Sequence, residues 1–235
     1  MRDLIITLIK CGVALLLGIL EGNGAVYFFN HMPAKWFCDY GQEPTEDMLD
    51  PYTQRIKSTP WKYIFSMLFV LLNIKMVMDG PQFMVAATFA LWLMLEMSIG
   101  DIKYGIIPDQ LLLLLSVTGL GFIVYNGSWQ RCLLGTAVGF GIMFIIALIG
   151  RLAYRRDTLG GGDIKMFTCL GFLLGPVGVI AVFMITAFIS AGHYVILLAG
   201  KKIKSSDTMP MVPYITVATM IYMVFLYGKL ELMIL

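Results

Sequence analysis

Two aspartates stand at the ends of strongly apolar stretches of the chain. Asp101 directly follows one such stretch, and Asp163 precedes another, immediately after the glycines Gly160, Gly161 and Gly162. An ionisable side chain at membrane depth is costly, and it often marks a functional site. Two carboxyl groups that share one partly dry site cannot both ionise easily, so they can hold one proton between them.

Such a pair contains the groups that peptide hydrolysis requires. The charged carboxylate acts as general base on a water molecule, and the protonated carboxyl polarises the scissile carbonyl and helps to protonate the leaving amine. This is aspartic-protease chemistry, which needs neither a metal nor a nucleophilic side chain. Because glycine has no Cβ and admits positive φ, the Gly160–Gly162 run would let a peptide approach the backbone and let Asp163 move toward Asp101.

Both acids also have a local interpretation. Asp163 could be the N-cap of the helix that follows it, the glycine run an ordinary loop, and Asp101 a helix-boundary acid. A small transporter or ion channel is a second class of protein that places carboxylates along a proton or cation path. Broken helices in matching halves would indicate a transporter. The sequence has one such break, at Gly175-Pro176, and acids that cluster at one membrane face favour the protease.

Membrane-spanning helices are the elements that would position these acids. The chain has 235 residues, of which 59% are hydrophobic and 14% charged, whereas a soluble domain carries about 25% charged residues. Several apolar runs reach the roughly 20 residues that a helix needs to cross a bilayer. The runs are solid and not alternating, which disfavours a β-barrel. We therefore predict an all-α, polytopic transmembrane helical bundle.

The apolar runs predict about eight spans, at residues 4–28, 61–78, 82–100, 108–126, 132–150, 164–174, 177–199 and 211–228. The stretch 164–199 is too long for one crossing, and Gly175-Pro176 interrupts it, so we divide it in two. Glu21 and Glu96 lie within predicted spans, and we expect each of them to pair with a nearby polar side chain.

The distribution of cations predicts the orientation in the membrane. The loops 29–62, 101–107, 151–165 and 200–209 alternate with the other connections and hold twelve of the seventeen Lys and Arg residues. The opposite side holds three, and two lie within spans. By the positive-inside rule the basic loops are cytoplasmic and the N-terminus lies outside. Asp101 and Asp163 would then both lie at the cytoplasmic membrane face.

The chain divides into two parts by its organisation. Residues 1–60 would form a first span and a short cytoplasmic loop, which is too small and polar for a core of its own, and residues 61–235 would form the main membrane domain. No C-x-x-C pair occurs, so we expect neither a metal site nor a disulfide framework. Nothing in the sequence points to a nucleic-acid partner. The four cysteines are Cys11, Cys38, Cys132 and Cys169.

Three motifs resemble those of the type IV prepilin peptidases, which belong to the GxGD intramembrane aspartyl proteases. "GGGD", Gly160 to Asp163, is followed by Lys165 and fits the motif that gives the proteases their name. "DIKYGIIPD", Asp101 to Asp109, is similar to the family's first aspartate motif, and "PMVPY", Pro210 to Tyr214, to the start of its last helix. The resemblance extends over roughly residues 95–230.

The resemblance implies roles for particular residues. Asp101 and Asp163 correspond to the catalytic pair, and Asp109 is expected to suit the positive end of a helix more than to take part in catalysis. The other motif residues are Gly160, Gly161, Gly162, Lys165 and Pro108.

The resemblance also implies a substrate and a location. Members of the family cleave the short leader of prepilins or pseudopilins at the cytoplasmic face of the bacterial cytoplasmic membrane. Many members also carry an insert with two C-x-x-C pairs and methylate the new N-terminus with S-adenosylmethionine. This chain has Cys38 alone in the corresponding loop. We therefore expect no tetracysteine site, and no cofactor unless methyl transfer is retained.

Overall fold

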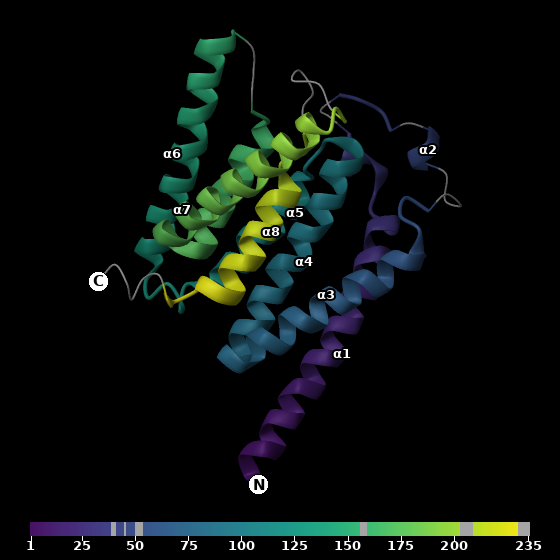
Figure 1. The fold of residues 1–235 in the computed structure, drawn as a ribbon, viewed down its shortest axis with the longest axis vertical. Helices are drawn as coiled ribbons and strands as arrows, with labels where there is room; N and C mark the ends of the chain where they lie inside the picture. The colour runs from purple at the N-terminus through teal and green to yellow at the C-terminus, as the bar shows by residue number, and fades with distance from the viewer. Residues whose placement is uncertain (39–40, 45, 50–53, 156–158, 203–208, 230–235) are drawn as a thin grey trace. The chain divides into compact units, whose positions relative to one another are not determined.

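The computed structural model describes residues 1–235 except 39–40, 45, 50–53, 156–158, 203–208 and 230–235. The described residues form helices and turns and contain no strand (Figure 1). This confirms the predicted all-α class. Five of the helices are long and apolar enough to cross a membrane, and the protein is therefore a multi-pass membrane protein.

The helices coincide with the predicted spans. They are α1 (Arg2–His31), α3 (Ser58–Asp79), α4 (Pro81–Tyr104), α5 (Asp109–Gly119), α6 (Trp129–Tyr154), α7 (Gly161–Ala199) and α8 (Val212–Ile221). Short helical turns are η1 (Ala34–Phe37), α2 (Glu46–Leu49), η2 (Leu120–Phe122) and the π-helical turn η3 (Tyr222–Leu226). The α5–η2 and α8–η3 segments are apolar but shorter than the other five.

Helix α7 reverses direction near its middle. Gly175 leaves the helical conformation with φ 70° and ψ 179°, and Pro176 follows it. The rings of Phe167 and Phe183 lie 6.0 Å apart, although a continuous helix would separate residues sixteen positions apart by about 24 Å. The two halves of α7 therefore fold back along each other, as the division of the stretch 164–199 at Gly175-Pro176 predicted.

A buried asparagine stabilises this reversal. Pro176 has no N–H group and Gly175 leaves the helix, so carbonyl groups just before the break lose their intrahelical partners. Asn126 is only 3% exposed, and its Nδ2 donates a hydrogen bond to the Leu173 carbonyl at 2.9 Å. The break is thus compatible with the apolar interior because a side chain replaces the missing backbone donor.

Glycines bring helices α6 and α7 into close contact (Figure 1). A Cβ on Gly135 would collide with the carbonyl oxygen of Gly171, and one on Gly139 would collide with that of Phe167. Small residues spaced four apart are typical of helix interfaces in membranes, where van der Waals packing drives association. The backbone of α6 therefore rests directly on the half of α7 that begins with the glycine run.

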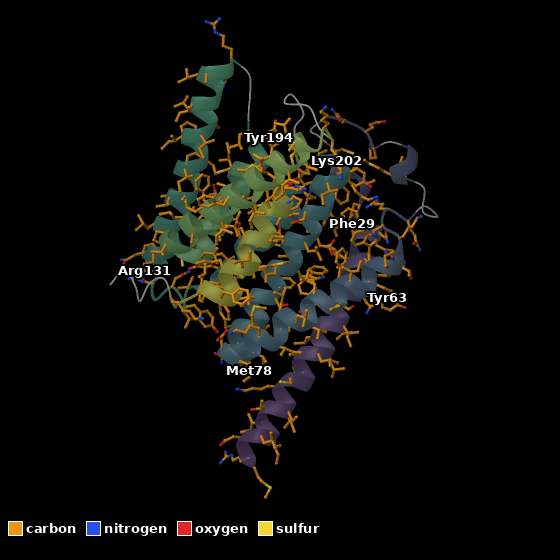
Figure 2. The ribbon with its side chains drawn as sticks, in the orientation of Figure 1. Phe29, Tyr63, Met78, Arg131, Tyr194 and Lys202 are labelled. Atoms are coloured by element: carbon orange, nitrogen blue, oxygen red, sulfur yellow. The ribbon has the colours of Figure 1, made fainter. Side chains whose placement is uncertain are left out.

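The chain forms two compact units, Met1–Glu96 (unit 1) and Met97–Leu235 (unit 2). In unit 1, Gly18 and Gly22 of α1 face the backbone of α3 in the same close manner. Phe29, labelled in Figure 2, is fully buried, and its ring lies 5.2 Å from that of Phe37. Unit 2 contains both of the aspartates that the sequence analysis selected.

Candidate active site

Asp101 lies in the last turn of α4. This helix ends because Gly105 adopts a φ of 66°, and the Gly105 N–H donates to the Asp101 carbonyl at 2.9 Å, which is a common way for glycine to end a helix. Three residues later, the buried Pro108 is the N-cap of α5, which begins at Asp109. The first aspartate motif therefore contains a helix end, a short connection and a helix start.

The Asp101 carboxylate binds the start of α8. The first N–H groups of a helix have no partner within it. Asp101 Oδ2 accepts a hydrogen bond from the Val212 N–H at 2.9 Å, and the Met211 N–H also donates to this carboxylate. Pro213 has no N–H group, and the Tyr214 N–H already donates to the Met211 carbonyl at 3.1 Å. A side chain of α4 thus caps the N-terminus of α8.

The sequence alone does not predict this contact. The motif "PMVPY" indicates only a similarity to the start of a last helix. A signal was present, because Pro213 indicates a helix that begins at the preceding residue, and the N–H of a first helical residue needs an acceptor from outside the helix. The sequence does not say which of its acids would supply that acceptor.

Asp163 lies in the first turn of α7, and Gly160 is the N-cap residue of this helix. The Asp163 N–H donates to the Gly160 carbonyl at 3.1 Å, and the Asp163 carboxyl accepts from the Gly160 N–H. The second contact is one half of a capping box, in which an acid three residues into the helix reaches back to the N-cap N–H, while Gly160 has no side chain to form the other half. The local interpretation of Asp163 as the N-cap is therefore wrong by three positions.

The two aspartates lie within electrostatic reach of each other. The charge on Asp101 acts on the Asp163 carboxyl, although they are sixty-two residues apart in the chain. Both side chains are half-buried, and both accept hydrogen bonds from backbone N–H groups at helix N-termini. The arrangement suits two carboxyl groups that share one proton.

The three glycines act differently from the flexible loop that the sequence suggested. None of them has positive φ, and Gly161 and Gly162 belong to the first turn of α7. Gly161 has open space around it, whereas a Cβ on Gly162 would lie 2.9 Å from Cδ1 of Ile107. Gly162 thus lets the start of α7 contact the connection between α4 and α5.

Two further motif residues pair with each other. Lys165 Nζ lies 2.7 Å and 2.9 Å from the two carboxylate oxygens of Asp109. The ion pair joins the first turn of α7 to the first residue of α5, and both side chains are substantially exposed. Asp109 is the first residue of its helix, in agreement with the expected preference for a helix N-terminus.

Two polar contacts hold α8 in place beside the aspartates. The Ser98 and Thr216 hydroxyl oxygens lie 2.7 Å apart, and both side chains are buried. Nδ1 of His193 lies 2.6 Å from the Tyr214 hydroxyl oxygen. The first contact joins α8 to α4 and the second joins it to the second half of α7, so the helices that carry Asp101 and Asp163 both hold α8.

Among the described residues, no three His, Cys, Asp or Glu side chains are grouped so that they could hold a metal ion. Cys38 is half-buried, and its Sγ lies 3.5 Å from the Ala34 carbonyl oxygen. The candidate site residues described above lie at the adjoining ends of α4, α5, α7 and α8.

The fold and this site define a helical, multi-pass membrane protein with a carboxyl pair at the ends of two of its helices. Residues 88–196, which include Asp101 and Asp163, match the type IV leader peptidase family. The match supports the resemblance to the type IV prepilin peptidases that the sequence motifs indicated, over this segment of the chain.

Curated relatives carry the same family name. The chain is 29% identical over 138 residues to a prepilin leader peptidase/N-methyltransferase of Bacillus subtilis, a match that covers 58% of this chain and 53% of the relative. A protein of the same name in Xanthomonas campestris is 28% identical, and the match covers 55% of this chain and 45% of the relative. One in Aeromonas hydrophila is 25% identical, and the match covers 57% of this chain and 47% of the relative. The chain thus spans about half the length of the relatives it matches. No solved structure matches it significantly.

Proposed function

We propose that this protein is a membrane aspartic endopeptidase that removes the leader of type IV prepilins or pseudopilins, with Asp101 and Asp163 as the catalytic pair. The observation that carries the proposal is that these two half-buried carboxyl groups come from separate helices and lie near enough for the charge of Asp101 to act on Asp163. The match of residues 88–196 to the type IV leader peptidase family favours a peptidase over a small transporter with intramembrane carboxylates.

The hydrogen bonds of the two carboxyl groups indicate which of them carries the negative charge and which holds the shared proton. Asp101 accepts two backbone N–H groups at the positive end of α8, and Asp163 accepts one. Donors and a helix dipole favour the charged form of a carboxyl group. We therefore assign the negative charge to Asp101 and the shared proton to Asp163.

In this scheme Asp101 takes a proton from a water molecule as its oxygen attacks the scissile carbonyl carbon, while Asp163 gives its proton to the carbonyl oxygen. When the tetrahedral intermediate collapses, the C–N bond breaks and Asp101 passes its proton to the leaving amine. Asp163 takes back the proton from the hydroxyl oxygen as the carbonyl re-forms. The pair returns to its starting state, and water is the second reactant.

We infer that the pair lies at the cytoplasmic face of a bacterial cytoplasmic membrane, with the N-terminus outside. The excess of cations in the alternate loops supports this orientation. The contacts of Asp101 with Asp163 and Val212, and of Lys165 with Asp109, agree with it, because they join helix ends that the prediction assigns to one face. We further infer that residues 61–235 form the catalytic core, with the lipid bilayer as their surroundings.

Methyl transfer is a separate question from cleavage. The relatives are named as N-methyltransferases as well as peptidases, but the chain carries a single cysteine, Cys38, in the loop where many members of the family have four. We assign no residue to S-adenosylmethionine, and we expect the new N-terminus of the product to be unmethylated. Mass spectrometry of the processed N-terminal peptide tests this, and a methylated product would overturn it.

The function is tested by co-expression with candidate prepilins and pseudopilins. We expect a smaller product on gels and a single new N-terminus by sequencing. An Asp163→Asn variant, which inserts into the membrane but cannot exchange the proton, is the control. A correctly inserted wild-type protein that leaves every prepilin uncut would count against the proposal.

A further inference from the structure

The first turn of α8 is part of the arrangement around Asp101. Its backbone N–H groups, at Met211 and Val212, fix the direction of the Asp101 carboxylate. This turn lies outside residues 88–196, the segment that matches the family. Any side chain that fixes the turn therefore also fixes the oxygen atoms of Asp101.

Tyr214 is such a side chain. It lies two residues after Val212, in the same turn, and its hydroxyl oxygen lies 2.6 Å from Nδ1 of His193. The two rings also pack, with centroids 5.7 Å apart. His193 belongs to the second half of α7, which folds back along the half that carries Asp163.

We propose that Tyr214 and His193 are positioning residues for the catalytic pair. Their contact joins the turn that orients Asp101 to the helix that carries Asp163, so it fixes the distance over which the two carboxyl groups share a proton. Small misplacements of reacting groups cost large factors in rate. The inference rests on the proposed function, and it adds residues that touch neither the substrate nor the reacting atoms.

Three variants test the contact: Tyr214→Phe, His193→Ala and the double variant. Losing one hydrogen bond is expected to lower kcat about fivefold, with KM unchanged because the substrate does not touch these side chains. The double variant should be no slower than His193→Ala, since that variant already lacks both the hydrogen bond and the ring contact. His193→Gln, whose amide oxygen can accept from the Tyr214 hydroxyl, should recover most of the rate.

The control is Tyr63→Phe in unit 1, labelled in Figure 2, which removes a hydroxyl from a side chain that is 63% exposed. It should cleave like the wild type. Wild-type kcat in Tyr214→Phe, or losses that multiply in the double variant, would overturn the inference. If the wild type cleaves no prepilin, the failure lies with the proposed function.

A second measurement does not depend on cleavage. A carbodiimide with an amine nucleophile labels carboxyl groups, and mass spectrometry of the Asp101 peptide gives the labelling rate. We expect faster labelling of Asp101 in Tyr214→Phe, because a displaced α8 turn no longer protects the carboxylate, and no change in Tyr63→Phe. The buried Ser98–Thr216 contact should keep α8 folded in these variants. Equal labelling rates in Tyr214→Phe and the wild type would contradict the inference.

Discussion

Unit 1 and unit 2 both contain acidic side chains within apolar helices, but the two units surround them with different donors. In unit 1, Glu21 Oε2 accepts from Asn73 Nδ2 at 2.8 Å and from the Thr88 hydroxyl at 3.0 Å. Trp92 Nε1 donates to the Glu21 backbone carbonyl at 3.1 Å. In unit 2, backbone N–H groups at helix N-termini donate to Asp101 and Asp163.

The difference shows how the same side-chain chemistry can serve two purposes. Side-chain donors from α3 and α4 hold the Glu21 carboxylate inside a packed bundle, where it links three helices. Backbone donors hold Asp101 and Asp163 at the ends of their helices. This contrast agrees with our proposal that the two aspartates are the catalytic pair, and it predicts that Glu21 serves the stability of unit 1.

The largest expected effect separates these two kinds of acid. Asp101→Asn and Asp163→Asn keep an oxygen that accepts the backbone N–H groups, so the helix caps persist, but neither amide can exchange the proton. We expect leader cleavage to fall by about 10³-fold or more, whereas Glu21→Gln should stay within about twofold of the wild type. Initial rates of leader cleavage by the purified proteins measure this effect. A Glu21→Gln variant as slow as the two aspartate variants would show that Glu21 does not differ from them in its role.

The next effect concerns the contact between α7 and the α4–α5 connection. Gly162→Val places a branched side chain against Ile107, which should displace the first turn of α7 and Asp163 with it. We expect turnover to fall by roughly 10- to 100-fold. Gly161→Ala is the matched control, because nothing lies within 4 Å of its Cβ position. Equal rates in the two variants would remove the positioning role of Gly162.

A moderate effect is expected on the stability of unit 1. Thr88→Val keeps the shape of the side chain but removes one donor to Glu21. Hydrogen bonds between membrane helices contribute about 1 kcal/mol, so we expect a free energy of unfolding lower by that amount and unchanged cleavage. Thr7→Val, whose hydroxyl contacts only the carbonyl of Asp3 in its own helix, is the control. A large loss of cleavage in Thr88→Val with normal stability would show that Glu21 contributes to cleavage and not only to the stability of unit 1.

The smallest effect is expected at the ion pair between Lys165 and Asp109. Both side chains are substantially exposed, and exposed pairs contribute about 0 to 1 kcal/mol. Lys165→Gln, Asp109→Asn and the double variant should each cleave within about threefold of the wild type, and the effect should shrink at high salt. A hundredfold loss in Lys165→Gln alone would show that this lysine contacts the substrate.

Much of the fold follows from the sequence. Apolar runs long enough to cross a bilayer predict the helices, and Gly175-Pro176 predicts the reversal of α7, because neither residue suits the middle of a helix. Glu21 has polar partners, as expected. The same expectation was wrong for Glu96, whose side chain is fully buried and whose two oxygens have no hydrogen-bond partner among the described residues.

The contacts between helices were harder to predict for a physical reason. A helix that is apolar all round carries no periodic pattern that marks its packed face. The sequence therefore did not show that Gly162 meets Ile107, that Lys165 meets Asp109, or that Asp101 binds the start of α8. These contacts depend on how each helix is rotated about its own axis.

The sequence by itself determined that this is a multi-pass helical membrane protein and selected its two aspartates, because hydrophobic length and isolated charges are properties of the chain. Only the tertiary structure decided which partner each acid has. Asp101 and Glu21 are both acids of apolar helices, yet one binds the unpaired N–H groups at the start of another helix and the other binds side chains. That choice is made by helix packing, which brings together groups that the chain keeps far apart.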